Sequence, residues 1–218
     1  MRIVIFANGI LEEPRAAAKR WVHPGDVIVG ADGGTLYVVE AGLIPDHVIG
    51  DVDSLPLDLR QRLAEEGTRF HTYPPAKDET DLELALRWAA EQTSATEIVV
   101  LGALGGRPDQ ELANLLLLAL PALKGHDVRL VGGGWEIRLI RSGETLTLHG
   151  QPGEIVSLVP LGGDAHGVTT SGLRYPLEDE VLHFGPARGI SNVLENENAT
   201  VIVDKGWLWC FHKRDRVA

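Results

Sequence analysis

Val48-Ile49-Gly50-Asp51-Val52-Asp53-Ser54 joins a short apolar run to a glycine and two carboxylates. The apolar residues are typical of a strand that ends near Gly50. Side chains alternate along an extended backbone, so we expect Asp51 and Asp53 to point the same way. Mg²⁺ prefers oxygen ligands and is usually held by one or two carboxylates together with substrate phosphates. Taken alone, the segment also fits a polar turn in which Asp53 and Ser54 cap the next helix.

The same arrangement of apolar run and polar turn recurs through the first part of the chain. Strands are predicted at 2–7, 26–30, 46–50, 69–73, 97–102 and 127–131, with helical segments at about 12–21 and 35–41 and from about 56, 80 and 109. Thr80-Asp81-Leu82-Glu83 matches the capping box that begins many helices. Strands that alternate with helices indicate an α/β domain with a largely parallel sheet.

The pattern changes after about residue 135. Short alternating segments are predicted as strands at 144–148, 155–159, 181–184, 200–203 and 207–211, with glycine and proline turns between them. No amphipathic run of helical length interrupts them. The sequence therefore predicts an N-terminal α/β domain at 1–138 and a C-terminal all-β sandwich at 139–218.

Composition limits the classes of partner. The 218 residues carry a formal net charge of −11, which argues against nucleic acid and membrane surfaces as partners, since both attract basic faces. Cys210 is the only cysteine, so an intrachain disulfide is impossible and a reducing compartment fits. The N-terminus reads as a strand rather than a signal peptide. We therefore expect a cytoplasmic protein.

Acidic residues follow several of the predicted strands. Asp32, Asp51, Asp53 and Asp109 each come after an apolar run, and Asp81 begins a predicted helix. Ligands of open parallel sheets bind outside the carboxyl ends of the strands. Carboxylates gathered there would repel one another unless a cation neutralised them. We interpret the group as a site for Mg²⁺ and a polyphosphate, rather than as separate caps and turns.

A glycine-rich turn adds a weaker signal. Gly102-Ala103-Leu104-Gly105-Gly106-Arg107 connects a predicted strand to a helix that begins near Asp109. Backbone N–H groups at such a turn and an arginine beside it suit a phosphate. The segment matches neither the Walker A motif nor G-x-G-x-x-G, so this pattern gives only weak support for phosphate binding.

As an ordered set, the motifs resemble those of thiamine pyrophosphokinases, also called thiamine diphosphokinases. The segments that carry the resemblance are Asp32-Gly33-Gly34, Gly50-Asp51-Val52-Asp53-Ser54, Lys77-Asp78-x-Thr80-Asp81-x-Glu83-x-Ala85-Leu86, Gly105-Gly106-Arg107-x-Asp109-Gln110, Thr170-Ser171-Gly172-Leu173-Arg174-Tyr175-Pro176-Leu177 and Gly189-Ile190-Ser191-Asn192. The resemblance implies a homodimer that moves the pyrophosphoryl group of ATP onto the hydroxyethyl oxygen of thiamine, giving thiamine diphosphate and AMP.

The resemblance also implies roles on the ATP side of the site. Asp51, Asp53 and Asp81 would hold Mg²⁺, and Arg107 would contact the phosphates. The other expected ATP-side residues are Lys77 and Gln110 as phosphate-side contacts, and Asp32 and Asp109 as groups that orient the thiamine hydroxyl or accept its proton. This sequence departs from the family pattern at two positions. Gln110 stands where many bacterial members carry His, and Pro108 where a bulky apolar residue is common. We therefore expect the contacts of this loop to differ from those of the family, without a change in the overall assignment.

Thiamine would be bound by the second domain. Tyr175 would stack on a cationic or aromatic ring, and Ser191 and Asn192 would hydrogen-bond the aminopyrimidine edge. Without the resemblance, Tyr175 reads equally well as a core or interface aromatic, and Ser191-Asn192 as an ordinary turn. The site would be shared between the subunits of the homodimer.

Three other functions fit parts of the sequence. A pyrophosphokinase for a hydroxymethylpterin would share the acidic residues without needing Tyr175 and Ser191-Asn192. A non-catalytic sensor of nucleotide or thiamine would not need the full carboxylate set. A Mg²⁺-dependent phosphohydrolase would release phosphate from ATP rather than AMP.

Overall fold

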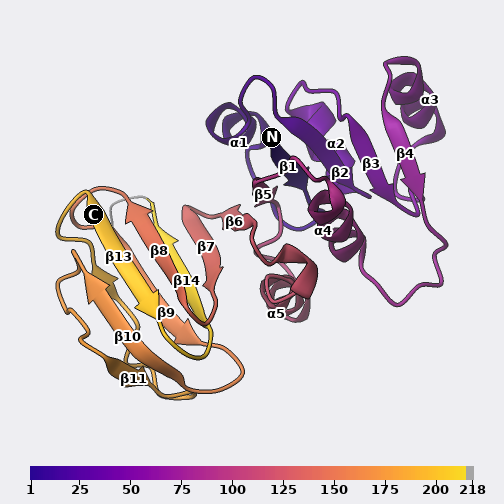
Figure 1. Ribbon diagram of the computed structural model, residues 1–218. Coiled ribbons are helices and arrows are strands. Elements are labelled where there is room, and N and C mark those ends of the chain that lie inside the picture. The colour runs from indigo at the N-terminus through magenta and orange to yellow at the C-terminus, as the bar shows by residue number, and fades with distance from the viewer. Residues whose placement is uncertain (215–218) are drawn as a thin grey trace. The chain divides into compact units, whose positions relative to one another are not determined.

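The computed structural model describes residues 1–214 and divides into two compact units, the first spanning Met1–Gly132 and the second beginning at Gly133 (Figure 1). The expected boundary after residue 138 falls inside β7 (Trp135–Ile140). β7 pairs antiparallel with β14 (Leu208–Lys213), so the second unit begins before that strand.

Unit 1 contains a parallel sheet in the order β6-β5-β1-β2-β3-β4. Its strands are β1 (Arg2–Phe6), β2 (Val27–Ala31), β3 (His47–Gly50), β4 (Arg69–Thr72), β5 (Glu97–Leu101) and β6 (Asp127–Gly132). The central strand β1 is buried from Ile3 to Phe6, because helices cover both faces of the sheet.

The helices of unit 1 are α1 (Pro14–Trp21), α2 (Gly34–Glu40), α3 (Leu57–Glu65), α4 (Asp81–Glu91), α5 (Pro108–Leu117) and the 3-10 turn η1 (Pro121–Leu123). α1 and α2 pack on the sheet face that carries Val4 and Phe6, and α3 covers Val48 on the same face. α4 packs on the other face against β2 and β3. Thr80 is confirmed as the N-cap, since the Glu83 N–H donates to Thr80 Oγ1 at 3.2 Å, whereas the Glu83 carboxylate accepts from Arg87.

The connection order places a crevice beside β1. β2, β3 and β4 extend from one side of β1, whereas β5 and β6 extend from the other. The chain therefore reverses direction across the sheet between β4 and β5, and loops that leave β1 and β5 diverge at their carboxyl ends. Such a switch point is where open α/β sheets bind ligands.

The second unit consists of two antiparallel layers. One has the order β12-β9-β14-β7 and the other β11-β10-β13-β8. The strands not yet given are β8 (Glu144–His149), β9 (Ile155–Pro160), β10 (Ala165–Ser171), β11 (Glu180–Leu182), β12 (Asn192–Val193) and β13 (Asn198–Val203). Alternate residues of both layers form one core, with Leu158 and Cys210 from the first and Val168 and Val201 from the second. The α/β domain followed by an antiparallel β domain is confirmed. β7, β10 and β12 were not predicted from the sequence.

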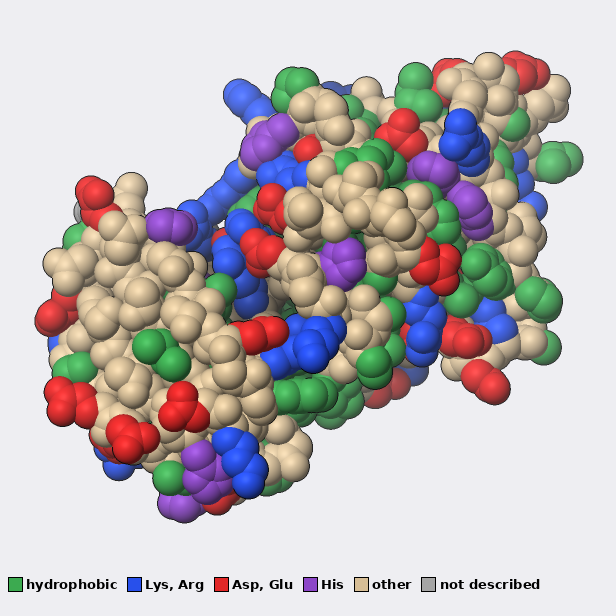
Figure 2. All heavy atoms as spheres, in the orientation of Figure 1, with side chains coloured by type: hydrophobic (Ala, Val, Ile, Leu, Met, Phe, Trp, Pro, Cys, Tyr) green, Lys and Arg blue, Asp and Glu red, His purple; other side chains and the backbone are tan. Residues whose placement is uncertain are grey.

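The surface is mixed in charge. Figure 2 shows acidic and basic side chains interspersed over the face that it draws. None of the helices in the described part of the chain has the length and apolar character needed to span a membrane.

Candidate functional site

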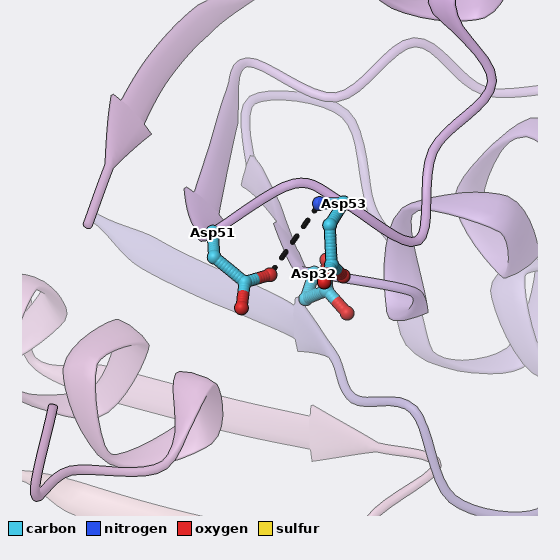
Figure 3. Close-up of side chains that lie close together, drawn as sticks. All are labelled: Asp32, Asp51 and Asp53. Carbon is cyan, nitrogen blue, oxygen red and sulfur yellow. Dashed lines mark hydrogen bonds between the residues drawn. The ribbon is translucent and has the colours of Figure 1, made fainter. Parts of the chain in front are cut away.

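A group of carboxylates lies at the carboxyl ends of β2 and β3. Asp32 follows β2, and Asp51 and Asp53 follow β3, which is its parallel neighbour. One carboxylate oxygen of each residue lies within 4.8 Å of the other two (Figure 3). The structure therefore brings together three of the predicted site residues, from two different loops.

The turn after β3 differs from the extended backbone expected from the sequence. β3 ends at Gly50, and Val52 adopts a left-handed conformation with φ of 55°. Such a conformation costs a residue about 1–3 kcal/mol, and burial of the Val52 side chain in a cluster with Val48 offsets this. Because Val52 faces the interior, Asp51 remains partly accessible and Asp53 exposed. Core packing, not strand alternation, brings the two carboxylates together.

Asp32 is the buried member of the group, with 7% of its surface exposed. Its N–H donates to the Ile49 carbonyl at 2.8 Å, and its Oδ2 accepts a hydrogen bond from Ser54 Oγ at 2.6 Å. Its Oδ1 is buried and has no hydrogen-bond partner within residues 1–214. A buried oxygen of this kind is unfavourable unless a ligand satisfies it. The carboxylates of Asp32, Asp51 and Asp53 together fit Mg²⁺, which takes hard oxygen donors.

Asp81 adjoins this group but has a different partner. A Cβ at Gly50 would lie 2.9 Å from Asp81 Oδ1 and 3.0 Å from Asp32 Cβ, so only glycine fits between the two acids. Asp81 Oδ1 accepts a hydrogen bond from Lys77 Nζ at 2.6 Å. The carboxylates that cluster are those of Asp32, Asp51 and Asp53, and the metal-binding role expected of Asp81 stays a prediction.

A cleft of about 460 Å³ opens in unit 1 at the carboxyl ends of β1, β2 and β5. Of the predicted residues, Asp32, Asp81, Arg107 and Gln110 line it. The remaining lining residues are Ala7, Asn8, Gly9, Ile10, Ala31, Thr80, Leu82, Ala103, Gly105, Gly106 and Asn114. The cleft coincides with the switch point of the sheet.

Two cleft residues were missed in the sequence. Asn8 follows the apolar strand β1 directly, and the rule that singled out Asp32 would have found it. Asn114 lies on the second turn of α5, and its Nδ2 donates to the Ala103 carbonyl at 2.8 Å. No sequence signal marks Asn114, because its place in the cleft depends on how α5 is oriented against the loop after β5.

Arg107 and Asp109 form an exposed pair at the start of α5. Arg107 Nη2 lies 2.6 Å from Asp109 Oδ2, and its Nε donates to Oδ1 at 3.2 Å. The hydrogen bond from Arg107 is the main cause that lowers the pKa of the Asp109 carboxyl below its ordinary value. A lowered pKa makes Asp109 a poor proton acceptor. It also lies outside the set of described residues that line the cleft.

The predicted thiamine-side residues lie in the second unit. Tyr175 is 63% exposed, and Ser191 is exposed with a left-handed φ of 61°. Asn192 is only 9% exposed. Its amide bonds within the chain, accepting from the Tyr175 N–H at 3.0 Å and donating to the Tyr175 carbonyl at 2.7 Å. The amide of Asn192 therefore bonds the backbone of Tyr175, and the direct ligand contact expected of Asn192 stays a prediction.

Comparison with known proteins gives the same two-part division. Residues 18–130 match the family model described as "Thiamin pyrophosphokinase, catalytic domain", and residues 144–208 match "Thiamin pyrophosphokinase, vitamin B1 binding domain". The thiamine pyrophosphokinase of Bacillus subtilis is 33% identical over 86% of this chain and 87% of its own.

Two solved structures resemble this fold over 99% of the chain. A crystal structure of the Bacillus subtilis thiamine pyrophosphokinase has a TM-score of 0.85 at 28% identity, covering 99% of this chain and 100% of that one. The thiamin pyrophosphokinase of Geobacillus thermodenitrificans has a TM-score of 0.84 at 28% identity, covering 99% and 98%. With both family models matched in order and a relative 33% identical over 86% of it, the chain belongs to the thiamine pyrophosphokinase family of enzymes.

Proposed function

We propose that this protein transfers the pyrophosphoryl group of ATP to the hydroxyethyl oxygen of thiamine in the presence of Mg²⁺, releasing AMP. The observation that carries the proposal is the unpartnered buried Oδ1 of Asp32, which lies within the carboxylate group that Asp51 and Asp53 complete. The names of the relatives and the two matched family models support the choice of thiamine as acceptor.

In this proposal Asp32, Asp51 and Asp53 hold the metal, and Asp81 lies beside them. The ion would supply positive charge that neutralises phosphate oxygens and fixes their direction. The carboxylates come from two adjacent strand ends, so the rigid sheet sets their spacing. Asp81 keeps Lys77 at the edge of the group through their 2.6 Å contact.

Arg107, Lys77 and Gln110 are proposed to bind the phosphates. Arg107 lines the cleft, and its guanidinium is held in a two-point contact by Asp109. A guanidinium presents donors in a planar fork that suits phosphate oxygens. The role proposed for Asp109 is therefore to orient Arg107, and the lowered pKa of its carboxyl argues against proton acceptance.

The transfer itself needs alignment more than acid–base strength. The thiamine hydroxyl oxygen forms a bond to the β-phosphorus of ATP while the bond from that phosphorus to the oxygen shared with the α-phosphate breaks. AMP leaves with that oxygen, and the proton that the hydroxyl loses passes to the phosphate of AMP or to solvent. Phosphoryl-type transfer of this kind depends mainly on positioning and charge stabilisation. The carboxylates, Arg107 and Lys77 supply the charges for this.

Tyr175 and Ser191 are proposed to receive the thiamine rings, with Tyr175 stacking on the cationic thiazolium. The proposal includes a homodimer in which each site takes residues from both subunits. We place the reaction in the cytoplasm, because a lone buried thiol at Cys210 suits a reducing compartment.

Product analysis tests the proposal. Purified protein is incubated with ATP and Mg²⁺, with and without thiamine, and the nucleotides and thiamine esters are separated. We expect AMP and thiamine diphosphate in equal amounts, only when thiamine and Mg²⁺ are both present. An Asp53→Asn variant with unchanged fold is the inactive control. Release of ADP and phosphate without thiamine would instead identify a phosphohydrolase, and absence of thiamine diphosphate would refute the proposal.

A further inference from the structure

Residues 172–175 and 192–195 run antiparallel and form a short ladder in the second unit. Leu173 and Leu194 lie opposite each other as a bridge. On either side of them, the Arg174 N–H donates to the Val193 carbonyl and the Glu195 N–H to the Gly172 carbonyl, both at 2.9 Å. Directly opposed residues of such a ladder alternate between pairs that exchange backbone hydrogen bonds and pairs that do not. Leu173 and Leu194 are a pair of the second kind, and by register Tyr175 and Asn192 are the next pair of that kind.

The side chain of Asn192 supplies two hydrogen bonds at this pair, which the backbone ladder leaves unbonded. Tyr175 N–H donates to Asn192 Oδ1 at 3.0 Å, and Asn192 Nδ2 donates to the Tyr175 carbonyl at 2.7 Å. The backbone of Asn192 pairs with β9, opposite Val156. An asparagine amide carries both a donor and an acceptor, so it can bond the N–H and the carbonyl of one backbone residue at once.

The segment is also fixed beyond Tyr175. Two hydrogen bonds join Leu177 to Thr170. The Leu177 N–H donates to Thr170 Oγ1 at 2.9 Å, and the Thr170 N–H donates to the Leu177 carbonyl at 2.9 Å. Pro176, between the two anchored residues, fixes its own φ. The backbone at Tyr175 is therefore held on both sides, while its ring remains 63% exposed.

We infer that Asn192 is a positioning residue that holds the backbone of Tyr175 for ring binding, and that it acts on the affinity for the cationic aromatic substrate without contacting it. This inference rests on the proposed function for the identity of that substrate. A ring held in place before binding loses little conformational freedom when a ligand stacks on it. Loosening the backbone would restore that freedom and weaken stacking.

Two substitutions separate this role from a ligand contact. Asn192→Asp keeps the acceptor but places a carboxylate oxygen against the Tyr175 carbonyl, where the donor stood. Asn192→Ala removes both bonds and serves if the Asp variant does not fold. We expect either to raise the KM for thiamine about tenfold, with the KM for ATP and kcat unchanged. Asn198→Asp is a matched control, because the Asn198 amide bonds His149 and not Tyr175.

A double-mutant cycle decides between positioning and contact. If Asn192 acts only through Tyr175, adding Asn192→Asp to Tyr175→Ala leaves the KM for thiamine at the value of the single Tyr175→Ala variant. Losses that add, or a single Asn192→Asp variant with an unchanged KM for thiamine, would overturn the inference.

Amide hydrogen exchange of the free protein tests the contact without any substrate. We expect Asn192→Ala, which removes the acceptor of the Tyr175 N–H, to speed exchange at Tyr175 by tenfold or more, while exchange at Val168 in the core of the same unit stays unchanged. If the wild-type protein made no thiamine diphosphate, the proposed function would fail, but this measurement would still decide the inference. Unchanged exchange at Tyr175 would overturn it.

Discussion

Ser54 Oγ donates a 2.6 Å hydrogen bond to Oδ2 of Asp32 and so links the turn after β3 to the end of β2. The bond fixes the rotation of the Asp32 carboxylate and leaves Oδ1 as its buried oxygen without a partner among residues 1–214. Ser54 therefore controls the direction in which Asp32 presents its free oxygen.

Replacing Ser54 should weaken metal binding. We expect Ser54→Ala to lower the affinity for Mn²⁺, used as a probe for Mg²⁺, by about tenfold or more, because one hydrogen bond to a charged group contributes about 1.5–3 kcal/mol. Electron paramagnetic resonance of free Mn²⁺ measures this without turnover. Ser54→Thr should restore the affinity, and Ser171→Ala, whose hydroxyl pairs with Thr200 in the other unit, is the control. Equal affinity in Ser54→Ala and wild type would contradict the prediction.

Lys77 should oppose metal binding and favour ATP binding. Its ammonium group lies 2.6 Å from Asp81 Oδ1, beside the carboxylate group. Lys77→Met removes a positive charge, so we expect Mn²⁺ to bind about fivefold more tightly and the KM for ATP to rise about tenfold. Calorimetric titration and steady-state kinetics measure the two effects.

A matched control pair exists on α4, the helix that begins at Asp81. Arg87 pairs with Glu83 at 2.7 Å with the same spacing of four residues, but on an exposed surface. Arg87→Met should change neither the affinity for Mn²⁺ nor the KM for ATP. A loss of Mn²⁺ affinity in Lys77→Met would contradict the electrostatic argument.

Stability should fall in mild acid through His47 and His71. Their rings are hydrogen-bonded at 2.9 Å, and the ring of His47 lies 4.3 Å from that of Trp88 on α4. Burial is the main cause that lowers the pKa of both imidazoles from the ordinary value of 6.5. Neighbouring Arg69 lowers both further, whereas Asp46 partly opposes the shift at His47.

The sign of the effect follows from these shifts. The unfolded chain binds protons more readily than the folded one, so the contribution is complete above about pH 6.5 and is lost as the pH falls toward the folded-state pKa values. Urea unfolding between about pH 7.5 and pH 5 measures it. His71→Gln should flatten this dependence and lower stability by about 1 kcal/mol at neutral pH. Part of the dependence should remain, since burial also lowers the pKa of His212.

Mixing two inactive variants tests the shared site. If each site takes Asp53 from one subunit and Tyr175 from the other, equal mixing of Asp53→Asn and Tyr175→Ala should leave roughly one quarter of the sites intact. Activity should therefore recover to about that fraction after subunit exchange. Exchange followed by labelled subunits, without any recovery of activity, would show that both residues act within one chain.

Local patterns in the sequence predicted much of the fold and part of the site. The apolar runs of unit 1 matched its strands because a parallel sheet buried on both faces leaves few polar residues in them. The capping box located α4 because the cap involves neighbouring residues only. Acidic residues at strand ends pointed to Asp32, Asp51 and Asp53, since in a parallel sheet all carboxyl ends lie at one edge.

Features that depend on long-range packing could not be predicted in this way. β7 and β10 were missed, because each has one face in the sandwich core and its pairing partner far along the chain. Strand alternation predicted the right carboxylates at 51 and 53 for the wrong reason, since Val52 leaves the extended conformation to bury its side chain.

The sequence by itself determined the order of strands and helices in unit 1, the N-cap of α4, and which carboxylates occupy the strand ends, because these features follow from neighbouring residues. The tertiary structure alone decided that Asp32 joins Asp51 and Asp53. It also decided that Asn192 bonds the backbone of Tyr175. Each of these contacts joins residues on different elements, and only the packing of the core fixes how close those elements come.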